Sequence, residues 1–78
     1  MWHFRTVTGI FWIVQAEDSD RVFLGVDEES LGTYQHYQLV IDSINAHTTG
    51  FLAWDIKTHM RVPACIEGWM LGEPLAWV

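Results

Sequence analysis

Near the start of the chain stands an apolar run with no polar interruption, Ile10-Phe11-Trp12-Ile13-Val14. Its residues are all β-branched or aromatic, which favours a strand. A strand with one face in water alternates apolar and polar residues, whereas this run does not. It is therefore typical of a strand that is covered on both faces, or whose second face is covered by a partner. The run predicts a strand at the centre of a sheet.

Two neighbouring segments also read as strands. Residues 2–7 begin with Trp2 and Phe4 on one face, and the pair Thr8-Gly9 supplies a turn before the central run. Residues 21–26 follow the central run and are again mostly apolar. Gly25 inside this segment indicates a β-bulge or a point where another group approaches the backbone closely.

The apolar residues change their spacing between residues 34 and 47. Tyr37, Val40, Ile41 and Ile44 follow the i, i+3, i+4, i+7 pattern, and polar residues occupy the positions between them. This spacing predicts one amphipathic helix.

Both ends of this helix have recognisable signals. Thr33 can act as its N-cap, and His47 near its end suits the negative pole of the helix dipole. The residues Thr48-Thr49-Gly50 then break the helix, with Gly50 available for a left-handed conformation.

The second half of the chain contains shorter apolar pieces. Residues 51–56 are predicted to form a strand, and residues 60–62 its hairpin partner, which ends at Pro63 because proline cannot donate to a ladder. In the tail, residues 69–71 and 75–78 are predicted to form a short strand or an irregular cover over the sheet.

The predicted element order is β-β-β-α-β-β. It indicates a single α+β domain over residues 1–78, an antiparallel sheet of four to six strands with one amphipathic helix packed on a face.

Charge limits the possible partners. Ten Asp and Glu residues against four Lys and Arg give a net charge of −6. Long-range repulsion therefore opposes direct binding to nucleic acid or to an anionic membrane. No apolar stretch approaches the ~20 residues that span a bilayer, and the first residues do not form a secretory signal. We expect a cytoplasmic protein whose charged partner is a basic protein.

The residues that could carry chemistry do not form a recognised motif. The four histidines lack metal-ligand spacing, and one cysteine is too few for a structural zinc centre. Cys65 is predicted to be a small buried residue. A folded metal site of Asp55, His59 and Cys65 and a reactive His59–Cys65 pair are weaker alternatives, the pair because the apolar neighbours of Cys65 disfavour a thiolate. We expect no enzyme, no catalytic residues, no cofactor and no metal.

Six of the ten carboxylates lie between residues 17 and 29, in two clusters at the edges of apolar runs. One interpretation is that these turns keep an apolar chain soluble. The other is that they pair with Arg and Lys side chains of a partner, whose affinity is increased by exposed aromatic rings. The candidate partner-binding residues are Glu17, Asp18, Asp20, Asp27, Glu28, Glu29, Trp12 and Phe23.

Eleven aromatic residues are many for a chain of 78 residues, because a small domain can hide only part of its surface. Some rings are therefore expected at an interface. The leading hypothesis is a non-enzymatic protein-binding module whose partner is a basic protein or nucleic-acid-binding complex. The alternative is a self-associating structural or assembly protein, for example a homodimer.

In size, charge and α+β layout the chain resembles the small acidic proteins that phages encode to block bacterial defence complexes, anti-CRISPR proteins among them. The resemblance is one of kind and assigns no site. It implies an inhibitor that mimics nucleic acid and occupies a nucleic-acid-binding surface of a host complex.

Overall fold

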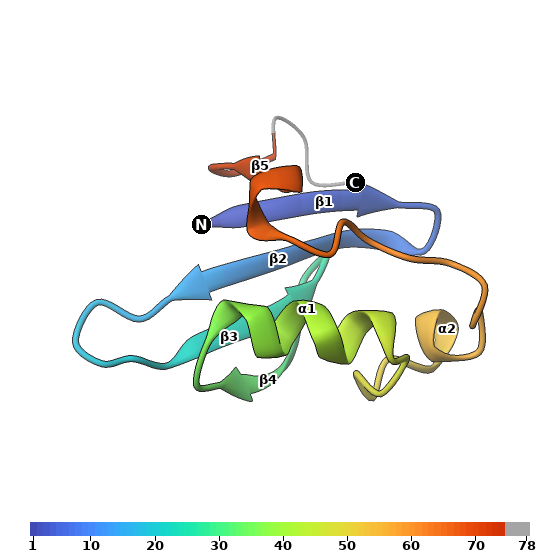
Figure 1. Ribbon diagram of the computed structural model, residues 1–78, viewed down its shortest axis with the longest axis horizontal. Coiled ribbons are helices and arrows are strands. Elements are labelled where there is room, and N and C mark those ends of the chain that lie inside the picture. The colour runs from blue at the N-terminus through green and yellow to red at the C-terminus, as the bar shows by residue number, and fades with distance from the viewer. Residues whose placement is uncertain (75–78) are drawn as a thin grey trace.

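The apolar run at the start of the chain forms the middle strand of a five-stranded antiparallel sheet (Figure 1). The structure is a computed structural model and describes residues 1–74. Along the sheet the strands have the order β4-β3-β2-β1-β5. Their bounds are β1 (Trp2–Thr6), β2 (Gly9–Gln15), β3 (Val22–Val26), β4 (Glu29–Tyr34) and β5 (Met70–Leu71). The predicted α+β class, antiparallel sheet and central position of β2 are confirmed.

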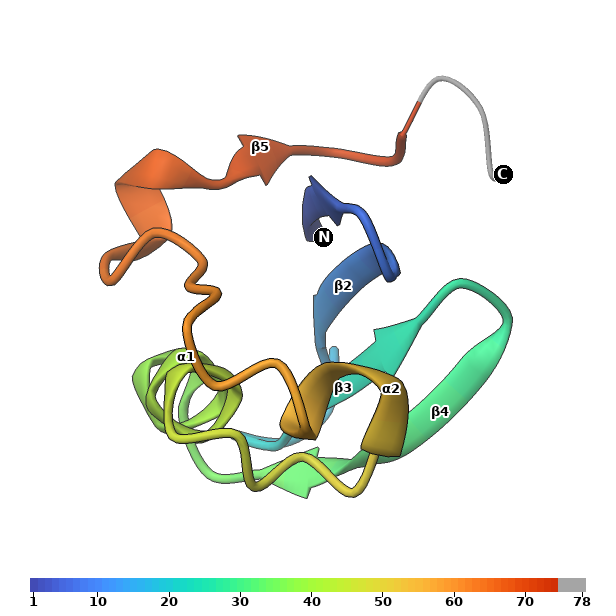
Figure 2. The same cartoon turned by 90° about the vertical axis from the view of Figure 1, so that its right-hand side faces the viewer.

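One face of the sheet is covered by helix. The long helix α1 (Tyr37–Asn45) contacts β2, β3 and β4, and Figure 2 shows the sheet curving around α1 and α2 (Leu52–Asp55). Burial of the large apolar side chains between the helices and the sheet supplies the main driving force for folding. The core consists of Phe11, Ile13, Val22, Leu24, Val26, Val40, Ile41, Ile44, Trp54, Val62 and Trp69.

The face of the sheet turned away from α1 is here called the outer face. Because side chains alternate along a strand, the residues between the core positions of β2 and β3 belong to it. Trp12 and Val14 of β2 and Phe23 and Gly25 of β3 are such residues. In the antiparallel register Trp12 lies opposite Gly25, and Val14 opposite Phe23.

Gly25 has both of the predicted roles. The register between β3 and β4 shifts between Leu24 and Gly25, as at a β-bulge. A Cβ atom at Gly25 would also lie 1.8 Å from Cζ2 of Trp12, so the indole ring occupies the space above this glycine.

The predicted helix is present, but it begins later than expected. Its N-cap is His36, whose Nδ1 accepts a hydrogen bond from the backbone N–H of Gln38 at 3.1 Å. Thr33 is instead a β4 residue paired with Phe23, so the prediction of an N-cap at Thr33 is wrong. Beyond the end of α1, His47 has a φ of 58° and Gly50 a φ of 87°, and the left-handed conformation at Gly50 is confirmed.

The prediction of a strand over residues 51–56, paired with residues 60–62, is wrong. This segment contains the short helix α2, and residues 60–62 belong to no strand. The Asp55 carboxylate accepts hydrogen bonds from the backbone N–H groups of Thr49 and Gly50 at 3.2 and 2.9 Å. These bonds close a compact turn around residues 49–55, which an extended strand could not form.

The element order also differs from the prediction because a fourth strand precedes the helix. Asp27 and Glu28 form the turn after β3, and the residues that follow, for which no strand was predicted, form β4. The observed order after β4 is α1, α2, a 3₁₀ turn η1 (Ile66–Gly68) and β5. Of the two alternatives predicted for residues 69–71, a short strand or an irregular cover, the strand is present as β5, whereas residues 75–78 lie outside the described residues.

Candidate partner-binding surface

The first acidic cluster, Glu17, Asp18 and Asp20, lies in the connection between β2 and β3. All three side chains are exposed, and none makes a hydrogen bond or ion pair with another part of the described chain. The turn is held by other groups, because Gln15 Nε2 donates to the backbone oxygens of Ser19 and Arg21 at 3.3 and 3.1 Å. The three carboxylates are therefore free to meet charges outside the chain.

The second acidic cluster consists of Asp27 and Glu28, in the turn between β3 and β4, and Glu29, the first residue of β4. Asp27 has a structural role, since its Oδ1 accepts a hydrogen bond from the backbone N–H of Ile10 at 2.8 Å. Its φ is 50°, a left-handed conformation that Asp and Asn tolerate better than most residues. The exposed side chains of Glu28 and Glu29 make no such contact within residues 1–74.

The two acidic clusters sit at opposite ends of β3. A strand of five residues is about 16 Å long, so the clusters form two separate patches with the outer face of the strand between them. A partner has to span the length of β3 to meet both patches.

Trp12 and Phe23, the two aromatic candidates, are both partly exposed on this outer face. The indole of Trp12 lies over Gly25, and its Nε1 donates to the backbone oxygen of Asp27 at 2.8 Å. Trp12 is thus tied to the second cluster. Phe23 is the second residue of β3 and is therefore near the first cluster, which precedes this strand.

Two hollows border the second acidic cluster. The Trp12 hollow, on the outer face, has a volume of about 440 Å³ and is lined by Met1, Trp12, Val14, Asp27 and Glu28. A second hollow of about 430 Å³ is lined by Val26, Asp27, Glu28, Glu29 and Phe51. The sequence did not predict that Met1, Val14 and Phe51 line these hollows. For Val14 the i, i+2 spacing from Trp12 on one strand was the available signal.

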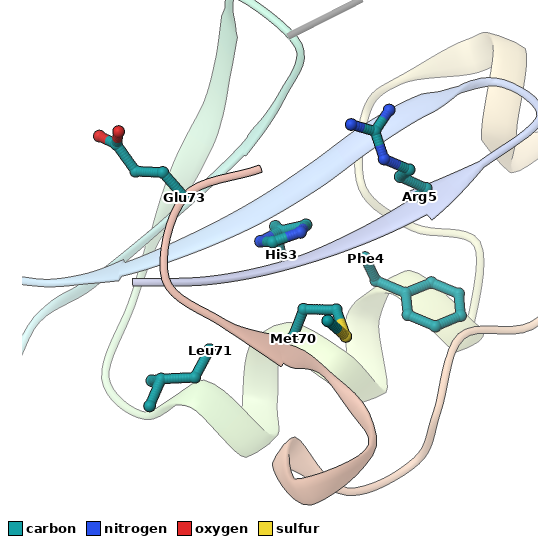
Figure 3. A pocket seen from close by; sticks show the side chains of 6 residues that line it. All are labelled: His3, Phe4, Arg5, Met70, Leu71 and Glu73. Atoms are coloured by element: carbon teal, nitrogen blue, oxygen red, sulfur yellow. The ribbon is translucent and has the colours of Figure 1, made fainter. Parts of the chain in front are cut away.

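A further cavity, of about 590 Å³, is lined by residues of the paired strands β1 and β5 (Figure 3). His3 and Arg5 reach it from β1, Met70 and Leu71 from β5, and Glu73 from the segment after β5. His3 Nδ1 lies 2.7 Å from the backbone oxygen of Gly72 and ties this segment to β1. The cavity mixes both signs of charge with apolar walls, so its chemistry selects no particular ligand.

Cys65 is exposed, so the prediction that it is buried is wrong. It is the N-cap of η1, a turn that has no buried residue. Cys65 and His59 share no hydrogen bond, and no three His, Cys, Asp or Glu side chains among residues 1–74 are grouped to hold a metal ion. In the same residues no helix has the length and apolar character required to cross a bilayer.

Comparison of the chain with models of protein families, with curated proteins and with solved structures gives no match.

Proposed function

We propose that this chain is a non-enzymatic binding module that docks on the basic, nucleic-acid-binding surface of another protein. One observation carries the proposal. Carboxylates without partners in the described chain lie at both ends of β3, and partly exposed aromatic rings lie on the outer face between them. Within residues 1–74 these carboxylates form no ion pair with Lys or Arg, including Arg21, which directly follows Asp20.

The two kinds of group have different parts in such a complex. Carboxylates attract a basic partner over long range and raise the rate of association. Trp12 and Phe23 supply apolar area that is desolvated on contact, and aromatic residues of this kind often dominate binding energy. Binding is therefore expected to weaken with salt without being abolished by it.

A phage-type inhibitor of a bacterial defence complex, anti-CRISPR proteins included, is the specific form of this proposal. The negative charges would take the place of the phosphates of a nucleic acid, so the chain and the nucleic acid would compete for one surface. The net charge of −6 and the exposed carboxylates support this form.

The test compares the chain with a variant in which five carboxylates are neutralised, Glu17→Gln, Asp18→Asn, Asp20→Asn, Glu28→Gln and Glu29→Gln. Its net charge is −6 + 5 = −1. Both proteins are immobilised and exposed to host lysate at low and at high salt. A captured basic protein is then purified, and its binding to nucleic acid is measured with and without the chain.

The proposal expects salt-sensitive capture by the native chain, weak capture by the variant, and loss of nucleic-acid binding when the chain is added. Equal capture by both proteins, or a partner that binds the chain and its nucleic acid at the same time, contradicts it.

Self-association is the second candidate function, and β5 is the observation that favours it. Met70 and Leu71 are 61% and 78% exposed on a strand at the edge of the sheet. An exposed apolar edge strand is a common site of pairing between chains. Sedimentation at increasing protein concentration, with Leu71→Lys as the control variant, tests this. A monomer throughout the series contradicts it.

A further inference from the structure

The Trp12 hollow combines apolar walls with carboxylates. Met1, Trp12 and Val14 provide apolar surface, and Asp27 and Glu28 come from the turn between β3 and β4. A ligand that fits this environment has an apolar stem and a positively charged end.

The indole of Trp12 is fixed in place. Its six-membered ring lies over Gly25, where even a Cβ atom would collide with it, and the side chain is partly exposed on the outer face. The hydrogen bond from Nε1 to the backbone oxygen of Asp27 sets the rotation of the ring. A ligand that stacks on this ring therefore loses little additional side-chain freedom of the protein.

Charge around the ring favours a cation. A guanidinium or ammonium group above an indole is attracted by the electrons of the ring. Glu28 has no partner among residues 1–74, and Asp27 uses only Oδ1 for its hydrogen bond to Ile10. Carboxylates beside the ring would add charge-assisted hydrogen bonds to the same cation.

We propose that the Trp12 hollow is the anchor pocket for an arginine side chain of the partner. The methylene stem of arginine packs on the apolar walls, and its planar guanidinium stacks on the indole and faces the two carboxylates. This inference rests on the proposed function, because it names the residue of a basic partner that the chain holds. An anion is repelled from the pocket, and a purely apolar side chain would desolvate the carboxylates without pairing them.

An NMR titration of the ¹⁵N-labelled chain tests the pocket. The probe is acetyl-Gly-Arg-Gly-Arg-Gly-amide, and the control probe is the same peptide with citrulline, which has nearly the shape of arginine without its charge. The indole N–H signal of Trp12 is assigned by its absence from Trp12→Phe. We expect this signal to shift saturably with the arginine peptide, and the citrulline peptide to bind at least about fivefold more weakly.

Two matched double variants separate the pocket from general charge. Asp27→Asn with Glu28→Gln removes two charges at the pocket, and Asp27→Asn keeps a side-chain oxygen for Ile10 and tolerates the left-handed backbone. Asp18→Asn with Asp20→Asn removes two charges at the other end of β3. We expect affinity for the arginine peptide to fall about tenfold in the first variant and less than about twofold in the second.

Three outcomes overturn the inference. They are equal shifts with arginine and citrulline, equal losses in the two double variants, and no response of the Trp12 signal. If the arginine peptide shifts only the signals of Glu17 to Asp20, the pocket assignment fails while the proposed acidic surface stands. If no cluster responds and the five-carboxylate variant still captures its partner, both fail.

Discussion

A side chain at position 25 would collide with the indole of Trp12. An alanine Cβ would lie 1.8, 2.1 and 2.4 Å from three ring atoms, distances at which the ring or the strand has to move. A Cβ atom added to Gly32, on the neighbouring strand β4, would have no such neighbour within 4 Å. Gly32 is therefore a matched control. The pair isolates the effect of the indole from the general effect of replacing glycine in this sheet.

We therefore expect Gly25→Ala to lower the free energy of unfolding by about 1–3 kcal/mol, the usual cost of forcing an extra group into a packed site. Gly32→Ala is expected to change it little. Urea denaturation of both variants measures the difference, and equal stabilities would show that Trp12 moves away from Gly25 without cost.

His47 joins three segments through its ring. Its Nδ1 lies 3.1 Å from the backbone oxygen of Trp54 and its Nε2 2.8 Å from that of Met60, while the ring stacks on Trp54 with centroids 5.1 Å apart. We expect His47→Ala to cost about 2 kcal/mol, because hydrogen bonding and stacking are lost together.

His59 provides the control for this histidine, because it is exposed and its side chain makes no contact of this kind within the described chain. His59→Ala is expected to change stability by less than about 0.5 kcal/mol. Thermal unfolding of both variants at one pH measures the two losses of stability. A similar loss in both would contradict the bridging role of His47.

At the scale of the element, the strands and helix with a local pattern were predictable. The uninterrupted run of β2 and the i, i+3, i+4, i+7 spacing of α1 reflect burial by neighbours, and that burial is visible in the sequence. β4 was missed because it begins with Glu29 and carries a glycine, so that its polar residues resembled a loop. A strand at the edge of a sheet needs less apolar character than a central one.

The error at α2 has a different cause. Six mostly apolar residues are too few to distinguish a strand from a short helix. What decides the structure is a distant partner: Trp54 is fully buried, and its Nε1 donates to the backbone oxygen of Ile44 at 2.8 Å. The sequence of residues 51–56 alone cannot predict this hydrogen bond, because its acceptor lies in α1.

Trp54 is also expected to be the residue that holds α2 on the core. Its ring meets Phe11 edge-on, with centroids 5.1 Å apart. We expect Trp54→Phe to lower the free energy of unfolding by about 2–3 kcal/mol, because the change leaves a gap in the core and removes a buried hydrogen bond. Among the described residues, the Ile44 oxygen then keeps only the bond that it accepts from the backbone N–H of His47 at 3.0 Å. Urea denaturation measures this loss.

Leu52 on the same helix is the control, since its side chain is 71% exposed. Leu52→Ala is expected to cost less than about 0.5 kcal/mol. If the two variants lose the same stability, α2 is held by its backbone contacts and not by the indole.

At the scale of the whole molecule, the sequence located the charges but not their arrangement. The acidic residues were expected to be exposed in turns because carboxylates are rarely buried without partners. Their separation to the two ends of β3, and the Trp12 hollow beside the second cluster, depend on which strands pair and which faces remain outside. The prediction that Cys65 is buried failed for the same reason, because apolar neighbours in the sequence do not place a residue in the core.

This charge arrangement has a consequence for stability. The net charge is −6, and the five carboxylates of Glu17, Asp18, Asp20, Glu28 and Glu29 make no ion pairs within the described chain, so their mutual repulsion opposes folding. Salt shortens the range of this repulsion to about 10 Å at 0.1 M. Raising NaCl from low concentration is therefore expected to increase the free energy of unfolding by about 0.5–1 kcal/mol.

The five-carboxylate variant used to test partner binding, with a net charge of −6 + 5 = −1, is the control for this last prediction. Its stability should respond little to the same change in salt, whereas any effect of NaCl on apolar burial is common to both proteins and cancels in the comparison. Urea denaturation of the two proteins over a series of NaCl concentrations measures the response. Parallel curves would mean that the carboxylates are too far apart to repel one another, and a loss of stability of the native chain with salt would mean that attractive ion pairs outweigh the repulsion.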